Sequence, residues 1–229
     1  MTATAVAATP LVFEELQLTG ESPGTLSFEV PRHRTVAITG EEDCGVELLA
    51  AYALGLSRPV RGEARVYGQN IAHMPRRAAL AYRRRVGYLP AGDGLLQNLS
   101  LRDNIGLPLR FGSDLPDRDI DGRLRVMLTA TRLSRAADLR PARANEELRR
   151  RAAFARALAF DPELVLLDRP FDGLTNRAAA ELLELARGGE SADGSRRSVL
   201  ITGQDLPDIL LNRVEVRYRV VNGALEREE

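Results

Sequence analysis

One short segment, TVAITGEEDCGVELL, has the spacing of a phosphate-binding loop but not its chemistry. The apolar run 35–39 leads into Gly40, Gly45 follows five positions later, and a helix-forming stretch comes next. In the pattern G-x-x-x-x-G-K-[ST], such a strand, loop and helix holds the phosphates of a nucleotide. Here Val46 stands at the lysine position and Glu47 at the position of the magnesium-binding hydroxyl. The spacing therefore predicts a nucleotide-type loop that lacks its cation.

The rest of the loop carries negative charge where a phosphate would lie. Glu41, Glu42 and Asp43 precede Cys44, so that four acids, with Glu47, surround the loop. Backbone N–H groups and a lysine normally supply the positive potential that attracts phosphate. One like-charge pair at about 4 Å costs about 4 kcal/mol at an effective dielectric of about 20, which is roughly a thousandfold in affinity. We therefore expect ordinary ATP binding to be lost, with no cofactor and no metal bound.

The composition is that of an ordinary globular domain. The chain has 229 residues, 44% hydrophobic and 28% charged, and its 32 basic residues, all arginine, balance 32 acidic ones. A net charge of zero gives no argument for binding nucleic acid. The single cysteine, Cys44, excludes an internal disulfide, and it fits a small residue in a tight turn better than a reactive thiol. His33 and His73 are isolated, which offers no metal-ligand spacing, and no apolar run is long enough to cross a bilayer.

Strand-like and helix-like segments alternate along the chain, which predicts an α/β fold with a mostly parallel sheet. Strands are expected at 35–39, 85–89, 163–167 and 198–202, and helices at 46–56, 75–85, 146–160 and 177–187. Early strands at 11–18 and 25–30, and a C-terminal hairpin whose Asn222-Gly223 pair favours a type I′ turn, give an antiparallel portion. Residues 1–9 are expected to form a loose tail, and residues 188–195 a surface linker.

The order of these segments resembles an ABC transporter ATPase subunit over nearly the whole chain. GLLQNLSLRDNIGLPL is similar to the stretch after the family's Q-loop, which faces the permease. RAAFARALAFDPELVLLDRPFDGLT resembles the signature helix, the Walker B strand and the D-loop, and ITGQDLPDIL resembles the H-loop segment. Together with QNIAHMPRRAALAYRRRVGYL, these segments are most similar in sequence to the ATPases of bacterial Mce-type or Mla-like lipid transporters.

The resemblance implies a single ABC-type nucleotide-binding domain over residues 1–229. It implies a P-loop, RecA-like core from 10–91 and 155–229, and an inserted helical subdomain at 92–154. The family uses ATP and magnesium, docks on a membrane permease at the inner side of the cytoplasmic membrane, and pairs head to tail. The implied partners are therefore a permease subunit and a second ABC ATPase-like chain, in a homodimer or a heterodimer.

The same resemblance shows that most functional positions hold other residues here. Walker B keeps its aspartate, Asp168, but the catalytic glutamate position is Arg169, which cannot accept a proton. The Q-loop glutamine position is Ala91, the D-loop aspartate position is Thr175, the H-loop histidine position is Gln204, and the signature L-S-G-G reads Ala144, Asn145, Glu146, Glu147. In a head-to-tail dimer, Glu146 and Glu147 would point at the partner's γ-phosphate. We therefore expect both half-sites, and hydrolysis with them, to be lost.

Charged side chains around the loop suggest internal compensation. We expect Arg169 to form an ion pair with Glu47 or Glu42, in place of the contacts that a nucleotide makes; the alternative is that these side chains face water in an empty cleft. Two arginine runs, 83–85 and 149–151, indicate either an anion or lipid-headgroup site or a solvated helix face, and the balancing acids favour the solvated face.

These observations favour a catalytically degenerate ABC ATPase-like subunit that docks on a permease, in a structural or regulatory role within a lipid transport system. The docking candidates are apolar residues of the permease-facing stretch, which alternatively form the core of the helical subdomain: Leu95, Leu96, Leu99, Ile105 and Leu107. Two other functions remain open. One is an ATP-binding subunit with an unconventional site that uses Arg169, and the other is a protein-binding module derived from an ABC ATPase.

Overall fold

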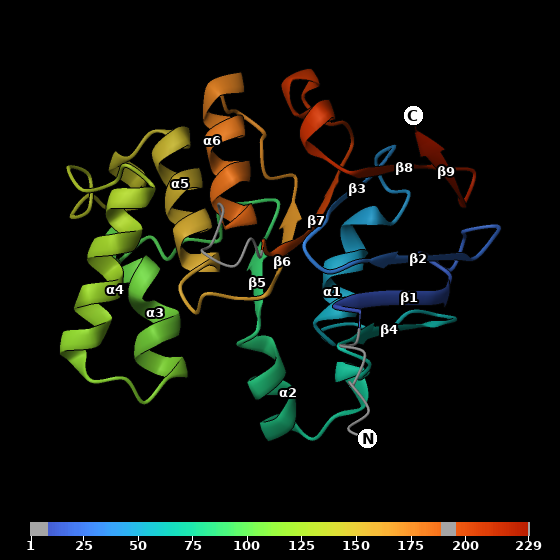
Figure 1. The fold of residues 1–229 in the computed structure, drawn as a ribbon, viewed down its shortest axis with the longest axis horizontal. Coiled ribbons are helices and arrows are strands. Elements are labelled where there is room, and N and C mark those ends of the chain that lie inside the picture. The colour runs from blue at the N-terminus through green and yellow to red at the C-terminus, as the bar shows by residue number, and fades with distance from the viewer. Residues whose placement is uncertain (1–8, 189–195, 229) are drawn as a thin grey trace, which may run out of the picture.

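A six-stranded sheet forms the centre of the computed structural model, which describes residues 9–188 and 196–228 (Figure 1). Its strand order is β5-β6-β7-β3-β8-β9, and all strands but the last run parallel. The strands span Val86–Leu89 (β5), Leu164–Asp168 (β6), Ser198–Gly203 (β7), Thr35–Gly40 (β3), Val216–Val221 (β8) and Ala224–Glu228 (β9). The mostly parallel sheet predicted from the sequence is confirmed.

A second, antiparallel sheet has the order β2-β1-β4. Its strands span Leu11–Leu16 (β1), Leu26–Val30 (β2) and Glu63–Val66 (β4). Phe13 pairs with Phe28 across β1 and β2, and their stacked rings lie 4.7 Å apart between centroids. Such cross-strand aromatic pairs hold the register of an antiparallel sheet. This sheet is the antiparallel portion that the early strands predicted.

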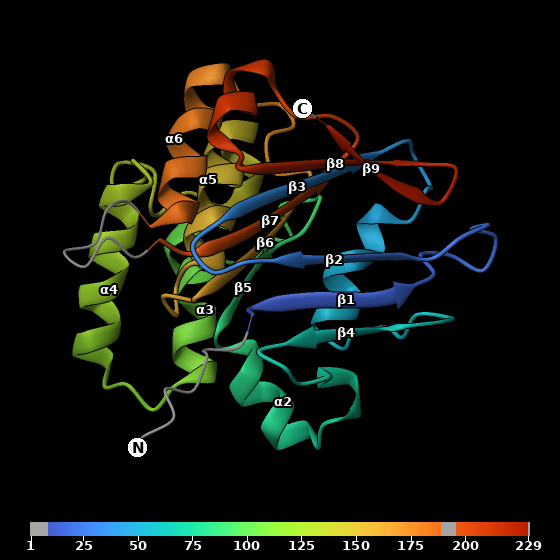
Figure 2. The ribbon, with the colours of Figure 1, turned by 45° about the vertical axis from the view of Figure 1, so that its right-hand side comes forward.

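The helices cover the two faces of the six-stranded sheet. They span Leu49–Ala53 (α1), Arg76–Arg83 (α2), Leu101–Gly112 (α3), Asp117–Ala130 (α4), Glu146–Ala157 (α5) and Asn176–Arg187 (α6), with 3₁₀ turns at Val46–Leu48, Ile71–His73, Pro141–Arg143 and Asp208–Arg213. In Figures 1 and 2, α3 to α6 lie on one side of the sheet, and α1 with the antiparallel sheet lies on the other. Side-chain oxygens of Ser100, Asn145 and Thr175 cap the first turns of α3, α5 and α6.

Alternation along each buried strand supplies both hydrophobic cores. In β6, Leu164 and Leu166 belong to the cluster beneath α1, whereas Val165 and Leu167 belong to the cluster beneath α3 to α6. Because side chains of a strand point alternately to opposite faces, a strand buried on both faces has to be apolar throughout. This requirement explains the uniformly apolar LVLL segment.

The helix expected at residues 46–56 is much shorter than predicted. A 3₁₀ turn precedes α1, which already ends at Ala53. Gly55 then adopts a φ of 62°, and a Cβ there would lie 2.7 Å from the backbone nitrogen of Ala72. The chain must turn sharply at this contact, and glycine alone permits the turn without strain.

The C-terminal hairpin is as predicted. Asn222 and Gly223 join β8 to β9 with positive φ angles of 50° and 75°, which is the requirement of a type I′ turn. The loose tail and the surface linker expected at the N-terminus and after α6 lie, apart from Thr9 and Gly188, outside the described residues.

Candidate functional site

The candidate loop lies at the edge where the parallel strands end. Gly40 ends β3, Asp168 ends β6 and Gly203 ends β7. The register places Asp168 opposite Thr202, and the three strands run side by side (Figure 2). Ligands of open α/β sheets bind at this edge. The fold therefore gathers segments that are far apart in the sequence into one candidate site.

The loop keeps the tight backbone of a phosphate-binding loop. Gly45 has a φ of 98°, and a Cβ there would lie 2.7 Å from the Cβ of Leu18. The backbone N–H of Cys44 donates to the carbonyl of Glu41 at 3.2 Å and closes a turn. A Cβ at Gly40 would lie 2.5 Å from the sulfur of Cys44. Local packing thus explains both glycines without any ligand.

The thiol in this turn is kept protonated. Burial raises the pKa of the Cys44 thiol; the backbone N–H of Val46 lowers it, and the carboxylates of Glu47 and Glu41 raise it again. A reactive cysteine needs the opposite, an electropositive setting that stabilises the thiolate. These surroundings agree with the interpretation of Cys44 as a small residue in a tight turn.

The side chains of the loop combine an apolar contact with negative charge. Val46, at the lysine position, is only 5% exposed and belongs to the core cluster beneath α1. The four acids of the loop, Glu41, Glu42, Asp43 and Glu47, are all exposed around it. The position that would carry the cation has become part of the core, and the solvent-facing positions carry anions.

Asp168 lies at the centre of the site and is 5% exposed. The hydroxyl of Thr202 donates to its Oδ1 at 3.2 Å. Burial raises the pKa of Asp168, while the hydrogen bonds from Thr202 and from the backbone N–H of Ala91 lower it; Glu47 adds a smaller rise and Arg169 a smaller reduction. The carboxylate is therefore held by two donors but remains costly to ionise.

We expect Asp168→Asn to stabilise the protein at neutral pH. An acid whose pKa is raised by folding loses stability as pH rises above its unfolded value of about 3.9, because the folded state must ionise a buried group. An asparagine keeps an acceptor for Thr202 without the charge. The expected gain in the free energy of unfolding at pH 7 is on the order of 1 kcal/mol, and it should vanish below about pH 4.

Urea denaturation of both proteins at pH 7 and at pH 4 measures this difference. Asp138→Asn is the matched control, because Asp138 has a 90% exposed side chain and pairs with Arg102 only at 3.5 Å. A loss of stability at pH 7 in the Asp168 variant would contradict the assignment of this group as a buried carboxylate that is costly to ionise.

Arg169 does not form the predicted ion pair with Glu47 or Glu42. Its Nε lies 3.0 Å from Oδ2 of Asp172, and its backbone N–H donates to the carbonyl of Thr202 at 2.8 Å with a φ of 45°. This local turn directs the side chain toward Asp172. The prediction was wrong because a sequence does not show which way a turn points a side chain. Both partners are about half exposed, so their pair contributes about 0–1 kcal/mol.

The H-loop and D-loop positions have different surroundings. Gln204 lies with Arg169 and Asp172 around an open pocket of about 310 Å³ at the ends of β6 and β7. Thr175 instead accepts the backbone N–H of Ala178 at 3.3 Å and caps α6. The structure therefore brings Gln204 and Arg169 together but gives Thr175 a local structural role.

The signature residues also contact their own chain. Asn145 caps α5 by accepting the backbone N–H of Leu148 at 2.9 Å. Glu147 accepts from Nε of Arg151 at 2.8 Å. The carboxylate of Glu146 lies against Gly173, where a Cβ would come within 2.3 Å of it. The two glutamates therefore have neighbours within this chain, next to the D-loop.

The arginine run 149–151 is not a solvated face, and that expectation was wrong. Arg150 and Arg151 are each 6% exposed. Arg151 lies between Glu147 and Glu181, at 2.8 and 3.2 Å. The run 83–85 is bonded as well, since Arg83 donates to the carbonyl of Leu54 at 2.9 Å and Arg85 pairs with Glu163 at 3.0 Å. The acids that appeared to balance a solvated surface are instead direct partners.

Three arginines of α5 hold the loop 90–94, which contains the Q-loop position. Arg150 donates to the carbonyl of Ala91 at 3.0 Å, and Arg149 pairs with Asp93 at 2.9 Å. Arg156 donates to the carbonyls of Gly94 and Asp93 at 2.6 and 2.8 Å. We call these three residues the arginine clamp. Sequence reasoning missed it, because an arginine run shows charge but not the carbonyls that it reaches.

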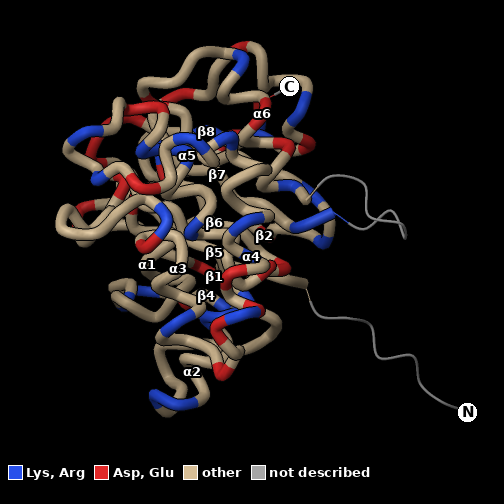
Figure 3. The backbone as a smooth tube through the Cα atoms, turned by 90° about the vertical axis from the view of Figure 1, so that its left-hand side faces the viewer, with Lys and Arg blue, Asp and Glu red and all other residues tan. Residues whose placement is uncertain are grey.

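Basic and acidic segments are interspersed over the described chain (Figure 3). This pattern matches the balanced composition and produces no large field of one sign on the face shown in the figure. Within residues 9–188 and 196–228, every helix is too short or too polar to span a lipid bilayer.

Comparison with known proteins decides the family. A family model described as ABC transporter matches residues 24–172. The intermembrane phospholipid transport system ATP-binding protein MlaF of Escherichia coli (strain K12) is 31% identical over 185 residues, which cover 81% of this chain and 68% of MlaF. The chain belongs to the ABC transporter ATP-binding family.

Other members of the family support the same assignment. The lipoprotein-releasing system ATP-binding protein LolD of Chromohalobacter salexigens is 31% identical over 71% of this chain and 69% of LolD. The solved dimeric structure of MJ0796, a bacterial ABC transporter cassette, superposes with a TM-score of 0.82 over 96% of this chain and 97% of that one, at 21% identity. The α/β fold predicted from the resemblance, with its ABC-type core, is confirmed.

The docking candidates of this ABC family member divide into two groups. Leu95 and Ile105 are 6% and 0% exposed and belong to the core cluster, so the prediction that they face a partner was wrong for both. Leu96 is 49% exposed, and Leu99 and Leu107 are half-buried. Within α3, packing against α4 and α5 buries the face that carries Ile105 and leaves the face that carries Leu107 partly exposed.

Proposed function

We propose that this ABC family member is a catalytically degenerate subunit that docks on a membrane permease without binding ATP, within a lipid transport system of the Mla type. The observation that carries the proposal is the burial of Val46 at the lysine position, beneath a loop whose exposed side chains are acidic. The assignment to lipid transport rests on the printed functions of MlaF and LolD.

The residues of the loop do not fit a nucleotide. A bound ATP would bring three or four negative charges against Glu41, Glu42 and Asp43, with no lysine to offset them. Each like-charge contact near 4 Å costs about 4 kcal/mol at an effective dielectric of about 20. Because the acids are exposed, water reduces this cost, but the loop offers only backbone donors in return. Magnesium, which takes oxygen ligands and relies on the phosphates for some of them, has Asp168 alone here.

The residues for hydrolysis are unsuitable for a separate reason. A catalytic base must accept a proton from the attacking water. Arg169 stays protonated at any ordinary pH, and it is held by Asp172. Gln204, at the histidine position, offers a neutral amide, which is not a base, and the two carboxylates of this pocket, Asp172 and Asp205, are paired with Arg169 and Arg219.

The arginine clamp supports a structural role. In an active ATPase, the nucleotide and the Q-loop connect the core to the helical segment that meets the permease. In this chain, Arg149, Arg150 and Arg156 connect loop 90–94 to α5 through the hydrogen bonds described above. The docking surface can therefore be held in place relative to the core without ATP.

Thermal unfolding in the presence of Mg-ATP tests the loss of nucleotide binding. We expect no shift in Tm at about 5 mM Mg-ATP. A ligand that binds at this site and is present at about a hundredfold over its Kd would add about 2.7 kcal/mol to the free energy of unfolding. An active ABC ATPase in the same buffer is the control. A saturable shift that disappears in Arg169→Ala would overturn the proposal in favour of an unconventional ATP site.

Site-specific photo-crosslinking in membranes tests the docking. A photoreactive residue at position 96 is expected to give an adduct with a polytopic membrane protein, identified by mass spectrometry as a permease subunit. The same residue at Val60, which is 70% exposed but belongs to the segment after α1, is the matched control. The docking model is wrong if position 96 gives no adduct or if both positions give the same one.

A further inference from the structure

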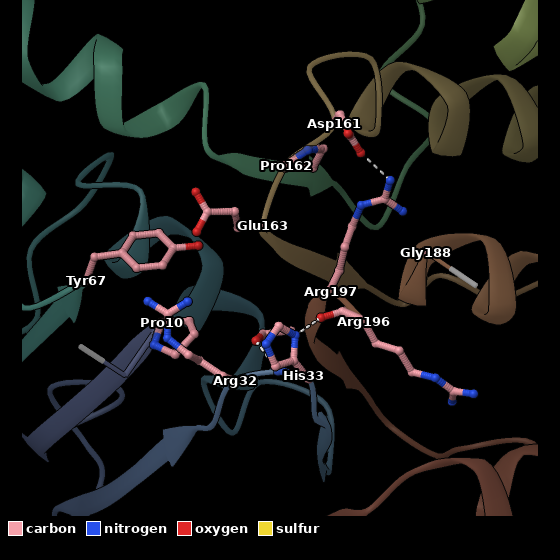
Figure 4. A pocket seen from close by; sticks show the side chains of 11 residues that line it. Pro10, Arg32, His33, Tyr67, Asp161, Pro162, Glu163, Gly188, Arg196 and Arg197 are labelled. Carbon is pink, nitrogen blue, oxygen red and sulfur yellow. Dashed lines mark hydrogen bonds and ion pairs between the residues drawn. The ribbon is translucent and has the colours of Figure 1, made fainter. Parts of the chain in front are cut away.

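A second pocket lies at the opposite edge of the parallel sheet, where the strands begin. Glu163 immediately precedes β6, Ser198 opens β7, and Arg32 and His33 come just before β3. The pocket has a volume of about 400 Å³ (Figure 4). Five strand residues span about 16 Å, so the pocket is well separated from the candidate nucleotide loop. No function proposed above uses it.

Tyr67 forms one wall of this pocket, and two contacts hold it in place. Its backbone N–H donates to the carbonyl of Pro10 at 3.0 Å, and the guanidinium of Arg85 stacks on its ring at 3.8 Å from the centroid. Its side chain is 9% exposed, and its hydroxyl is buried without a hydrogen-bond partner. Figure 4 shows the hydroxyl pointing into the pocket. Burial raises the pKa of Tyr67 to about 12, so this hydroxyl remains a donor at neutral pH.

The acids that line the pocket are already engaged. Glu163 receives two hydrogen bonds from Arg85, at 3.0 and 3.1 Å, in a bidentate pair. Asp161 pairs with the guanidinium of Arg197 on the far wall, as Figure 4 shows. Each carboxylate is thus neutralised by an arginine of its own.

Arg32, unlike the two acids of the pocket, has a donor atom without a partner. Its Nε is buried and lacks a hydrogen-bond partner, and no ion pair of the described residues engages its side chain. In Figure 4 its guanidinium lies below the ring of Tyr67. Leaving a buried donor unpaired is unfavourable, and more so for a charged group. Two unpaired buried polar groups in one pocket, one of them cationic, indicate that something supplies their partner.

We propose that this pocket binds a small molecule through an oxyanion group, a phosphate or a carboxylate, held by the guanidinium of Arg32 and the hydroxyl of Tyr67. A guanidinium presents a planar set of donors that matches the oxygens of either group. The hydroxyl supplies a second donor from another wall. The volume is within the range of small-ligand pockets, about 300–1,000 Å³.

His33 lines another side of the pocket, and hydrogen bonds fix its position. Its Nδ1 bonds to the backbone carbonyl of Arg196, and its backbone N–H donates to the hydroxyl of Ser198 at 3.0 Å. The ring is therefore fixed in the tautomer with a proton on Nδ1, since a carbonyl can only accept.

Titration of the full-length chain with four probes tests the proposal: inorganic phosphate, sulfate, glycerol 3-phosphate and succinate, each at the ionic strength of a sodium chloride control. Thermal unfolding and the ³¹P line width of the phosphate probes report binding. We expect saturable binding that is weakened roughly tenfold to a hundredfold in Arg32→Gln, and less in Tyr67→Phe, as hydrogen bonds to a charged group predict. Stabilisation by the phosphate probes alone assigns a phosphate ligand, and stabilisation by succinate alone assigns a carboxylate ligand.

The control variants are Arg34→Gln, an exposed arginine at the start of β3, and Tyr82→Phe, a half-buried tyrosine outside the pocket. Both should bind like the unchanged protein. The ligand-free Arg32→Gln variant should unfold at the same or a higher temperature, because it removes a guanidinium whose Nε is buried without a partner, whereas a purely structural arginine would lower that temperature on removal. The proposal is overturned if sodium chloride reproduces every shift or if Arg32→Gln binds the probes normally.

Discussion

Arg150→Ala is expected to lower the free energy of unfolding by about 3–5 kcal/mol, as breaking a buried charged interaction does. Arg150 is 6% exposed and donates to the carbonyls of Pro90 and Ala91, at 3.4 and 3.0 Å. Burial lowers the pKa of its guanidinium, and the acids around it, first Asp172 and then Asp93, raise it. Removing the side chain takes away the hydrogen bonds to these two carbonyls and a buried positive charge close to both acids.

The measurement is urea denaturation of the variant beside Arg150→Lys and Arg177→Gln. Lysine keeps the charge but lacks the planar donors, so we expect an intermediate loss. Arg177 has an 80% exposed side chain and pairs with Glu181 on the same helix, so its replacement should cost less than about 0.5 kcal/mol. Equal stabilities for the Arg150 and Arg177 variants would show that the arginine clamp does not join the loop to α5.

Asn104→Ala is expected to cost about 2–4 kcal/mol and to loosen the segment that carries the proposed docking surface. Asn104 is completely buried in α3. Its Oδ1 accepts the backbone N–H of Leu96 at 2.7 Å, and its Nδ2 donates to the carbonyls of Leu96 and Ser100 at 3.0 and 2.9 Å. One side chain therefore satisfies several backbone groups of the loop before α3, and alanine satisfies none of them.

Hydrogen exchange separates the local effect from the global one. The amide of Leu96 should lose protection well beyond the loss expected from global stability, while amides of β6 follow global stability alone. Asn98→Ala is the matched control, because Asn98 is an exposed asparagine of the same loop. If the two alanine variants exchange alike at Leu96, the loop is held by something other than Asn104, and the docking surface needs a different explanation.

Patterns of local sequence predicted most of the framework. The apolar runs of β3, β6 and β7 identified buried strands because a strand covered on both faces leaves no place for polar side chains. Asn222 and Gly223 identified the last hairpin because few other residues accept two consecutive positive φ angles. The length of the helix after the loop was overestimated. The close approach of Gly55 to Ala72 follows its end, and a contact between residues so far apart cannot be read from local sequence.

The candidate site was predicted in its positions but not in its contacts. The order of segments placed Gly40, Asp168 and Gln204 in a family pattern, and the structure brings their strands to one edge. The pairing of Arg169 with Asp172 instead of a loop carboxylate depended on a backbone turn with a φ of 45°. The split between buried Ile105 and half-buried Leu107 depended on which face of α3 meets its neighbours.

The sequence by itself determined the class of fold, the family and the loss of the lysine and glutamate positions, since residue type and spacing carry that information directly. Only the tertiary structure decided where the arginines go. It buries Arg150 against the loop carbonyls and leaves Arg32 unpaired in a pocket at the far edge of the sheet. The physical reason is that a charged side chain acts through the partners within a few ångströms of it, and packing brings those partners from distant parts of the chain.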